Sequence, residues 1–261
     1  MAAAVAAIGA LAMPSLASAK PRPSVSWTVQ RGASEGAPIP FSWSGRHLGK
    51  NYRLVVQRPV GTARTWKTML KLNTRRGSAE LPAQALGKYR FRLAALRGRR
   101  VLASKVVGVG VFGQVPFSVL MKGGYLNFGD LDNGVYATPT ASFPYVGSAW
   151  VGDHGQPKTV FSVKRNHCTA VHLGFVLGDT PGESYLHPGS IYGVVRLVQQ
   201  SRDPVTAEVP LNGIGSVDAE LTPGQTWSLL VEENSRDGEI GNPTAYFNGY
   251  AVCDSAEPFF S

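Results

Sequence analysis

Two cysteines, Cys168 and Cys253, offer the clearest chemistry that residue type and spacing predict in this 261-residue chain. In an exported protein, two cysteines most simply form one disulfide, and the alternative is a pair of buried free thiols. The bridge would close a loop of about 85 residues, which the chain-entropy description values at about 4–5 kcal/mol. We therefore expect one disulfide and no cysteine nucleophile.

The residues that could carry catalysis form no recognisable set. The chain lacks the Gly-x-Ser-x-Gly motif that presents the nucleophile in many hydrolases. His154 stands in a Gly-rich loop and could act as a base, but no partner nucleophile accompanies it. Asp218 and Glu220 would share one face of a strand, as the two carboxylates of a glycosidase might require, but a solvated strand face explains them as well. We expect a protein that is not an enzyme; the alternative is a small hydrolase acting on glycans.

Hard oxygen ligands gather at Asp130 and Asp132, beside the glycine turn at Gly134. Such ligands suit Ca²⁺, which takes six to eight oxygens, although the spacing is not that of an EF-hand. The alternative is the ordinary turn chemistry of Asp, Asn and Gly. A possible structural Ca²⁺ is thus the one cofactor that the sequence indicates.

A sugar-binding surface would combine exposed aromatic rings with polar side chains. Two regions rich in glycine and polar residues offer this combination, although aromatic residues are also ordinary core residues of an all-β fold. The candidate ligand-binding residues are Tyr145, Trp150, Asp153, His154, Tyr185 and His187.

The charge of the chain is divided very unevenly. Residues 20–112 contain 19 Lys and Arg against two acidic residues, a net charge of +17, whereas residues 113–261 contain seven against 15, a net charge of −8. So basic a segment favours polyanions such as cell-envelope polymers, and a secreted protein rarely meets nucleic acid. The alternatives are an Arg-rich surface without a partner, or docking on its own acidic half. The candidate polyanion-binding residues lie at predicted turns: Arg75, Arg76, Arg97, Arg99 and Arg100.

The first 19 residues are apolar, rich in Ala, and end in Ala17-Ser18-Ala19. This pattern predicts a secretory signal peptide, residues 1–19, although no Lys or Arg precedes the apolar run. A membrane anchor is the alternative, but the run is short and broken by Pro14. A Pro-rich linker, residues 20–24, follows. We expect a secreted, extracellular protein whose mature chain has no transmembrane segment, and association with the cell surface is compatible with this expectation.

Residues 25–112 read as seven short strands separated by turns at intervals of 8–12 residues, which is typical of a β-sandwich. The segments 40–43 (PFSW), 52–56 (YRLVV) and 87–93 (GKYRFRL) resemble strands of a fibronectin type III or Ig-like module. The segment has no cysteine pair of the Ig type. The resemblance implies a spacer or adhesion unit and no specific activity.

Residues 113–261 are again predicted to be all strands, organised around Thr159–Gly178, which reads as two strands separated at Lys164–Asn166. In the second of these strands Val171, Leu173, Phe175 and Leu177 would share one face. Long polar loops between eight or more strands suggest a jelly roll. Five segments resemble the strand series of an NPCBM-like carbohydrate-binding domain, which implies sugar binding: 159–163, 171–175, 194–198, 226–231 and 246–253.

Together these features predict a secreted, non-catalytic, all-β protein of two β-sandwich domains. The first is basic and Ig/fibronectin III-like, and the second is acidic, jelly-roll-like and closed by a disulfide. Its predicted partner is a carbohydrate or an anionic cell-envelope polymer. A structural surface protein without a small ligand is a further alternative.

Overall fold

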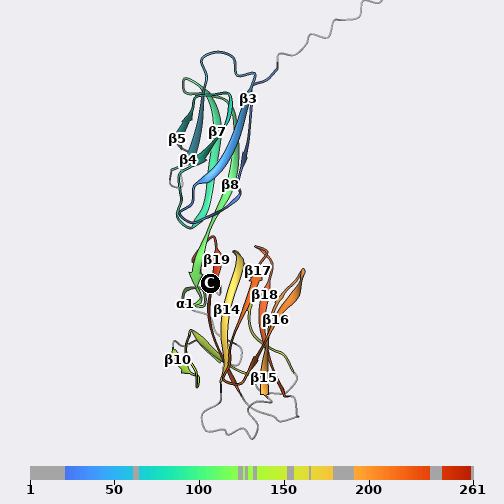
Figure 1. Ribbon diagram of the computed structural model, residues 1–261. Helices are drawn as coiled ribbons and strands as arrows, with labels where there is room; N and C mark the ends of the chain where they lie inside the picture. The colour runs from blue at the N-terminus through green and yellow to red at the C-terminus, as the bar shows by residue number, and fades with distance from the viewer. Residues whose placement is uncertain are drawn as a thin grey trace, which may run out of the picture.

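The computed structural model describes residues 21–60, 65–122, 126, 129–131, 134–151, 156–164, 166–178, 191–235 and 243–259. The described chain is almost entirely β-structure, arranged in several sheets with mostly antiparallel pairing, which confirms the predicted all-β class (Figure 1). The predicted signal peptide lies outside the described residues. Within them, no helix is both long and apolar enough to cross a membrane.

The first half of the chain builds two layers around one core. A three-stranded antiparallel sheet consists of β1 (Ser24–Val29), β3 (Ile39–Arg46) and β6 (Arg76–Leu81). The other layer orders β5 (Trp66–Leu72), β4 (Arg53–Pro59), β7 (Gly87–Arg97) and β8 (Arg100–Pro116), and the short β2 (Gly32–Ser34) pairs in parallel with β8.

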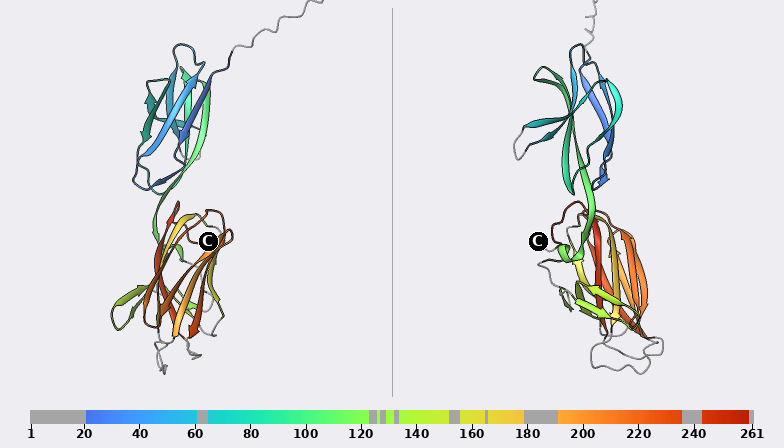
Figure 2. Two further views of the ribbon diagram at one scale, coloured as in Figure 1. Left: turned by 45° about the vertical axis from the view of Figure 1, so that its right-hand side comes forward. Right: turned by 60° about the vertical axis from the view of Figure 1, so that its left-hand side comes forward.

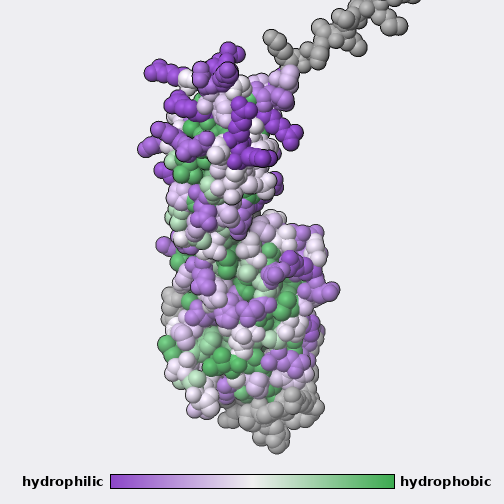
Figure 3. Space-filling view, turned by 45° about the horizontal axis from the view of Figure 1, so that its top comes forward, coloured by the Kyte–Doolittle hydropathy of each residue, from purple (hydrophilic) through white to green (hydrophobic). Residues whose placement is uncertain are grey.

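Alternating residues of both layers fill this first core. Trp27, Phe41 and Trp43 come from the three-stranded sheet, and Phe91 and Leu93 from β7. The intervening residues point outward, as the two-residue period of a strand requires. Many of them are hydrophilic, and they crowd the end of this half that lies away from the second core (Figure 3).

Strand β8 links the two halves without a break (Figures 1 and 2). It pairs with β7 along most of its length and then, from Gly113 to Pro116, with the last strand of the chain, β19 (Thr244–Cys253). Val111 belongs to the first core and Val115 to the second. The chain therefore passes from one core to the next along a single strand.

The second half also has two main layers. In one, β14 (Cys168–Gly178) lies between β17 (Ile214–Glu220) and β19, with β12 (Gly147–Trp150) and β9 (Gly129–Asp130) beyond β19. The other orders β13 (Lys158–Val163), β18 (Trp227–Ser235), β15 (Ile191–Gln199) and β16 (Arg202–Pro210). A hairpin of β10 (Gly134–Ala137) and β11 (Ser142–Tyr145) stands apart as a two-stranded sheet.

The face predicted for β14 is confirmed. Val171, Leu173, Phe175 and Leu177 are all buried in the second core, where they meet Trp227 of the opposite layer.

One sequence-based expectation for this half is corrected and another is confirmed. Phe117–Lys122, part of the segment 113–261 that was predicted to be all strands, begins instead with a short helix, α1 (Phe117–Leu120). Phe117 and Leu120 are both buried, and their spacing of three residues brings them to the same face of a helical turn. The two strands of Thr159–Gly178 do form, but they belong to different layers: β13 pairs with β18, and β14 with β17 and β19.

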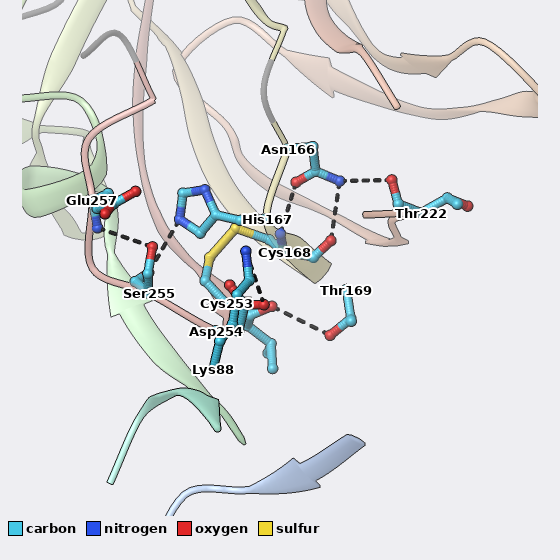
Figure 4. The surroundings of a disulfide bond; sticks show 11 residues. Lys88, Asn166, His167, Cys168, Thr169, Thr222, Cys253, Asp254, Ser255 and Glu257 are labelled. Carbon is cyan, nitrogen blue, oxygen red and sulfur yellow. Dashed lines mark hydrogen bonds and ion pairs between the residues drawn. A yellow bond between two sulfur atoms is a disulfide. The ribbon is translucent and has the colours of Figure 1, made fainter. Parts of the chain in front are cut away.

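A buried side chain explains why this connection crosses between layers. The Asn166 side-chain amide donates hydrogen bonds to the carbonyls of Cys168 and Thr222, both at 3.0 Å, and its oxygen accepts one from the Cys168 N–H at 2.9 Å. These bonds tie the start of β14 to Thr222, which follows β17, so the chain is held here at the layer that contains β14 and β17 (Figure 4).

The predicted disulfide between Cys168 and Cys253 is confirmed, and it joins β14 to β19 directly where the two strands pair. Beside it, His167 Nε2 lies 3.1 Å from the Ser255 carbonyl oxygen (Figure 4). The Asp254 carboxylate reaches back to Lys88 of the first half at 3.5 Å. The bridge therefore stabilises the end of the second half that meets the first.

Candidate functional site

A groove of about 370 Å³ lies on the outer face of the sheet formed by β14 and β19. Its lining is almost wholly aromatic, glycine and amide. The lining residues are Phe143, His172, Gly174, Asn248, Gly249 and Tyr250.

Strand alternation and register place these side chains. His172 and Gly174 face outward from β14 and lie directly opposite Tyr250 and Asn248 of β19. The rings of His172 and Tyr250 stack, with centroids 5.1 Å apart and planes inclined by 27°. This pair forms one wall of the groove.

Two glycines keep the floor of the groove low. A Cβ atom on Gly174 would lie 3.4 Å from the Phe143 ring and would fill the space between the walls. At Gly249 a Cβ atom would overlap the carbonyl oxygen of His172, so only glycine allows the two strands to approach so closely here.

Asp218 of β17 orients the imidazole. Its carboxylate oxygen lies 2.6 Å from His172 Nδ1, and residues 218 and 172 are paired in register. Because Nδ1 is engaged, the other ring nitrogen, Nε2, is the one with which His172 can meet a ligand. Among the described residues, no hydroxyl or thiol is hydrogen-bonded to this imidazole, so the pair does not extend to a nucleophile.

The opposite wall comes from the β10–β11 hairpin, which carries Phe143. Asn248 Nδ2 donates a hydrogen bond to the Pro144 carbonyl at 3.0 Å and so ties the hairpin to β19. Tyr246 stacks on Tyr136 with centroids 4.5 Å apart and packs at 4.8 Å against Tyr145. These contacts hold the hairpin against the sheet beside the groove.

Of the six predicted sugar-binding residues, the structure describes two, and neither lines the groove. Tyr145 belongs to the tyrosine cluster under the hairpin, where it covers Gly134. Trp150 on β12 is 42 % exposed, and the Lys158 ammonium lies 4.0 Å from the centre of its ring. The remaining four candidates lie outside the described residues: Asp153, His154, Tyr185 and His187.

The predicted calcium ligands cannot be assembled from the described side chains. Asp130 contributes its backbone to β9, whereas Asp132 lies outside the described residues. Within the described part of the chain, one cluster has the residue types of a metal site: His167, Cys168 and Cys253. Both of its thiols are consumed by the disulfide.

Several carboxylates on the described strands of the second half have structural partners. Asp218 contacts His172, and Glu220 lies 3.1 Å from Arg202. Glu232 and Glu233 are both buried, but as neighbours on β18 they point to opposite faces of the sheet.

Arg196 compensates the buried charge of Glu232. Its guanidinium lies 2.8 Å from the Glu232 carboxylate, which also accepts a hydrogen bond from Asn234.

The predicted polyanion-binding arginines do share one end of the first half. Two of these arginines reach the same glycine: Arg75 donates a hydrogen bond to the Gly49 carbonyl at 3.2 Å, and the Arg97 guanidinium lies 3.0 Å from where a Cβ atom of Gly49 would be. At the β7–β8 turn, the Gly98 carbonyl accepts a hydrogen bond from Arg53 at 3.1 Å. The turns that carry the arginines therefore meet at the hydrophilic end seen in Figure 3. Arg76, Arg99 and Arg100 lie at or beside the ends of β6, β7 and β8 in the same place.

The sequence-based reasoning missed most of the groove. One available signal was the alternation of Tyr246, Asn248 and Tyr250 against the buried Phe247 and Ala251, which places three outward side chains in a row. Nothing in the sequence near β19 indicated that Phe143, about a hundred residues earlier, would complete the wall.

Comparison with family models gives no match for this chain, and no curated protein matches it in sequence.

Proposed function

We propose that the protein is a secreted, non-catalytic binding protein that attaches to carbohydrate or to a cell-envelope polymer. In this proposal the two hydrophobic cores are two β-sandwich domains, the first Ig/fibronectin III-like and the second jelly-roll-like. The observation that carries the proposal is the aromatic groove between His172–Tyr250 and Phe143 on the second half.

The chemistry of the groove suits a sugar ring. A pyranose has apolar C–H faces that pack on aromatic rings, and its rim of hydroxyls needs donors and acceptors. Phe143 and Tyr250 offer apolar ring surface, while the His172 imidazole, held by the Asp218 carboxylate, offers a polar atom. The glycine floor leaves room for a flat ring, and the volume of about 370 Å³ falls within the usual range for ligand sites.

A binding role fits these groups better than hydrolysis. Glycosidases place two carboxylates across the scissile bond, one of them in a setting that favours its protonated form. The described carboxylate nearest the groove, Asp218, is exposed and engaged by His172, a setting that orients a hydrogen-bonding group. The hydrolase reading would require a second carboxylate facing it.

A glycan array tests the proposal. The chain from Lys20 is applied in roughly 0.5 M salt, which screens the charge of the basic half. We expect one class of sugar to bind, and Tyr250→Ala to weaken that binding by at least about tenfold because the ring stacking is lost.

The matched control is Trp150→Ala, which removes an exposed aromatic residue from β12, outside the groove. It should leave the array signal unchanged. A blank array would overturn the proposal. Loss of binding in the Trp150 variant alone would move the site to the region predicted from the sequence.

A further inference from the structure

A second hollow, of about 380 Å³, opens in the first half, where the β4–β5 hairpin separates from β7. β4 pairs with β7 only as far as Gln57, opposite Arg92, but continues to pair with β5 as far as Pro59. Beyond Arg92 toward its N-terminal end, β7 runs on to Gly87 with β8 alone as its partner. The hairpin therefore leans away from the sheet, as the right-hand view of Figure 2 shows. The hollow is lined by residues of the hairpin on one side and of β7 on the other, and we call this space the gap.

Cations line both sides of this gap. Arg58 and Lys67 come from the hairpin, and Lys88 and Arg90 come from the unpaired part of β7. Lys88 has the Asp254 carboxylate at 3.5 Å. Among the described residues, none of the other three has a carboxylate within ion-pair distance.

The two acidic residues of the first half do not neutralise the cations of the hollow. Glu35 accepts a hydrogen bond from the Leu86 N–H at 3.0 Å, and Glu80 stands on β6 in the opposite layer, paired with Pro40. Like charges gathered around one hollow repel each other, and an anion placed between them would relieve that repulsion.

The β4–β5 hairpin and β7 are held together at the point where they diverge. Arg92 donates to Gln57 Oε1 from Nε at 3.0 Å and from Nη2 at 2.6 Å, and its guanidinium lies 4.5 Å from the centre of the Trp66 ring. Burial lowers the pKa of Arg92, as expected for a cation withdrawn from solvent. This clasp fixes the hairpin relative to β7, so the hollow is a built feature of the fold.

Besides the four cations, the lining of the hollow consists of Pro59, Val60 and Tyr89. The one aromatic ring in its lining, Tyr89, already stacks on Phe91 at 6.2 Å, and its hydroxyl donates to the Ala85 carbonyl. No open ring is left there for a nucleic acid base to stack on. Guanidinium groups bind oxyanions through two parallel hydrogen bonds, and ammonium groups add point charges.

We propose that this hollow binds the phosphate or sulfate groups of an anionic polymer. The four cations surround one oxyanion group from two sides, and the open ends let the polymer continue past it. This site is separate from the aromatic groove and from the arginine-rich end, and it stands on its own observations. It gives the basic half a defined binding position in place of a diffuse positive surface.

The test compares three variants of the full chain from Lys20 that each remove two positive charges. The first, Arg58→Gln with Arg90→Gln, removes one positively charged side chain from each side of the hollow. The second, Arg99→Gln with Arg100→Gln, alters the arginine-rich end. The third, Lys71→Gln with Lys105→Gln, removes exposed charges of the same layer outside the hollow.

Affinity is measured for two probes, dextran sulfate and long-chain polyphosphate, which separate sulfate from phosphate recognition. We expect the hollow variant to lose roughly tenfold or more for at least one probe, because charge-assisted hydrogen bonds are removed. The other two variants should change by roughly twofold or less, as expected for screened surface charges.

An equal loss in all three variants would overturn the proposal in favour of general charge attraction. A loss confined to the Arg99 and Arg100 variant would overturn it in favour of the arginine-rich end. Tyr250→Ala, tested beside them, should bind polyphosphate normally, and because polyphosphate contains no sugar ring this outcome is independent of the sugar proposal. Circular dichroism and the unfolding midpoint verify that each variant is folded.

Discussion

At the scale of single residues, the groove depends on two glycines that have no side chain as much as on the side chains that form its walls. Gly174 and Gly249 leave the floor open, while the outward row on β19 supplies the polar and aromatic groups. The His172 ring is fixed from two directions, by the Asp218 carboxylate and by the Tyr250 ring. A binding group oriented in advance loses less conformational freedom when a ligand arrives.

Gly249→Ala should destabilise the protein, because the added Cβ atom would overlap the His172 carbonyl oxygen and force β14 and β19 apart. We expect the free energy of unfolding to fall by about 1–3 kcal/mol, measured by urea denaturation. Gly108→Ala on β8 is the control, since its Cβ atom would meet nothing closer than 4.0 Å. Equal stability of the two variants would contradict the close approach described here.

Part of this site was readable from the sequence. The i, i+2 spacing of Asp218 and Glu220 correctly predicts that both side chains lie on one exposed face of their strand, whereas the alternation on the last strand was a signal that was not used. Which of these side chains meet is decided by the pairing of strands that are far apart in the sequence. The spacing of residues along the chain does not reveal that pairing. Phe143 and His172 therefore came together only in the structure.

At the scale of elements, most strands were predictable because their buried residues alternate clearly. The error at Phe117–Lys122 arose because a single helical turn with two buried apolar residues is too short to show a helical period. The separation of β13 from β14 was missed because Asn166 acts through bonds to backbone at Cys168 and Thr222, and the latter is 56 residues away.

The disulfide gives a prediction at this scale. Replacing Cys168 and Cys253 together by Ala should lower the stability of the second half by about 4–5 kcal/mol, since 85 residues separate the two cysteines. Urea denaturation followed by the fluorescence of Trp227, in the second core, reports the change. The environment of Trp43, in the first core, should change at the same urea concentration as in the parent protein.

Single-tryptophan versions of the chain separate these two signals. A loss of less than about 1 kcal/mol in the second half would show that the bridge constrains the unfolded chain far less than its loop length predicts.

At the scale of the whole molecule, a basic half and an acidic half share one continuous strand. The charge division was evident from composition, and the Lys88–Asp254 ion pair is a direct contact between the two halves. Strand β8 carries the chain from one core to the next with no linker between β7 pairing and β19 pairing. Composition could not indicate this continuity, because Gly113 and Pro116 resemble the residues of a loop.

In this arrangement the two proposed binding sites lie at different places on one molecule. The groove on β14 and β19 offers aromatic rings in the acidic half, and the hollow beside β7 offers cations in the basic half. An envelope polymer that carries both sugar rings and anionic groups would engage both, and two linked contacts bind more tightly than either one alone.

The most direct test of the central proposal is an NMR titration of the ¹⁵N-labelled chain from Lys20. The probes are short neutral oligosaccharides with glucose, N-acetylglucosamine or mannose units, so that charge plays no part. The proposal predicts that one probe shifts the amide signals of His172, Gly174, Asn248, Gly249 and Tyr250, and that Tyr250→Ala abolishes these shifts. Shifts confined to other surfaces, or no shifts with any probe, would contradict it.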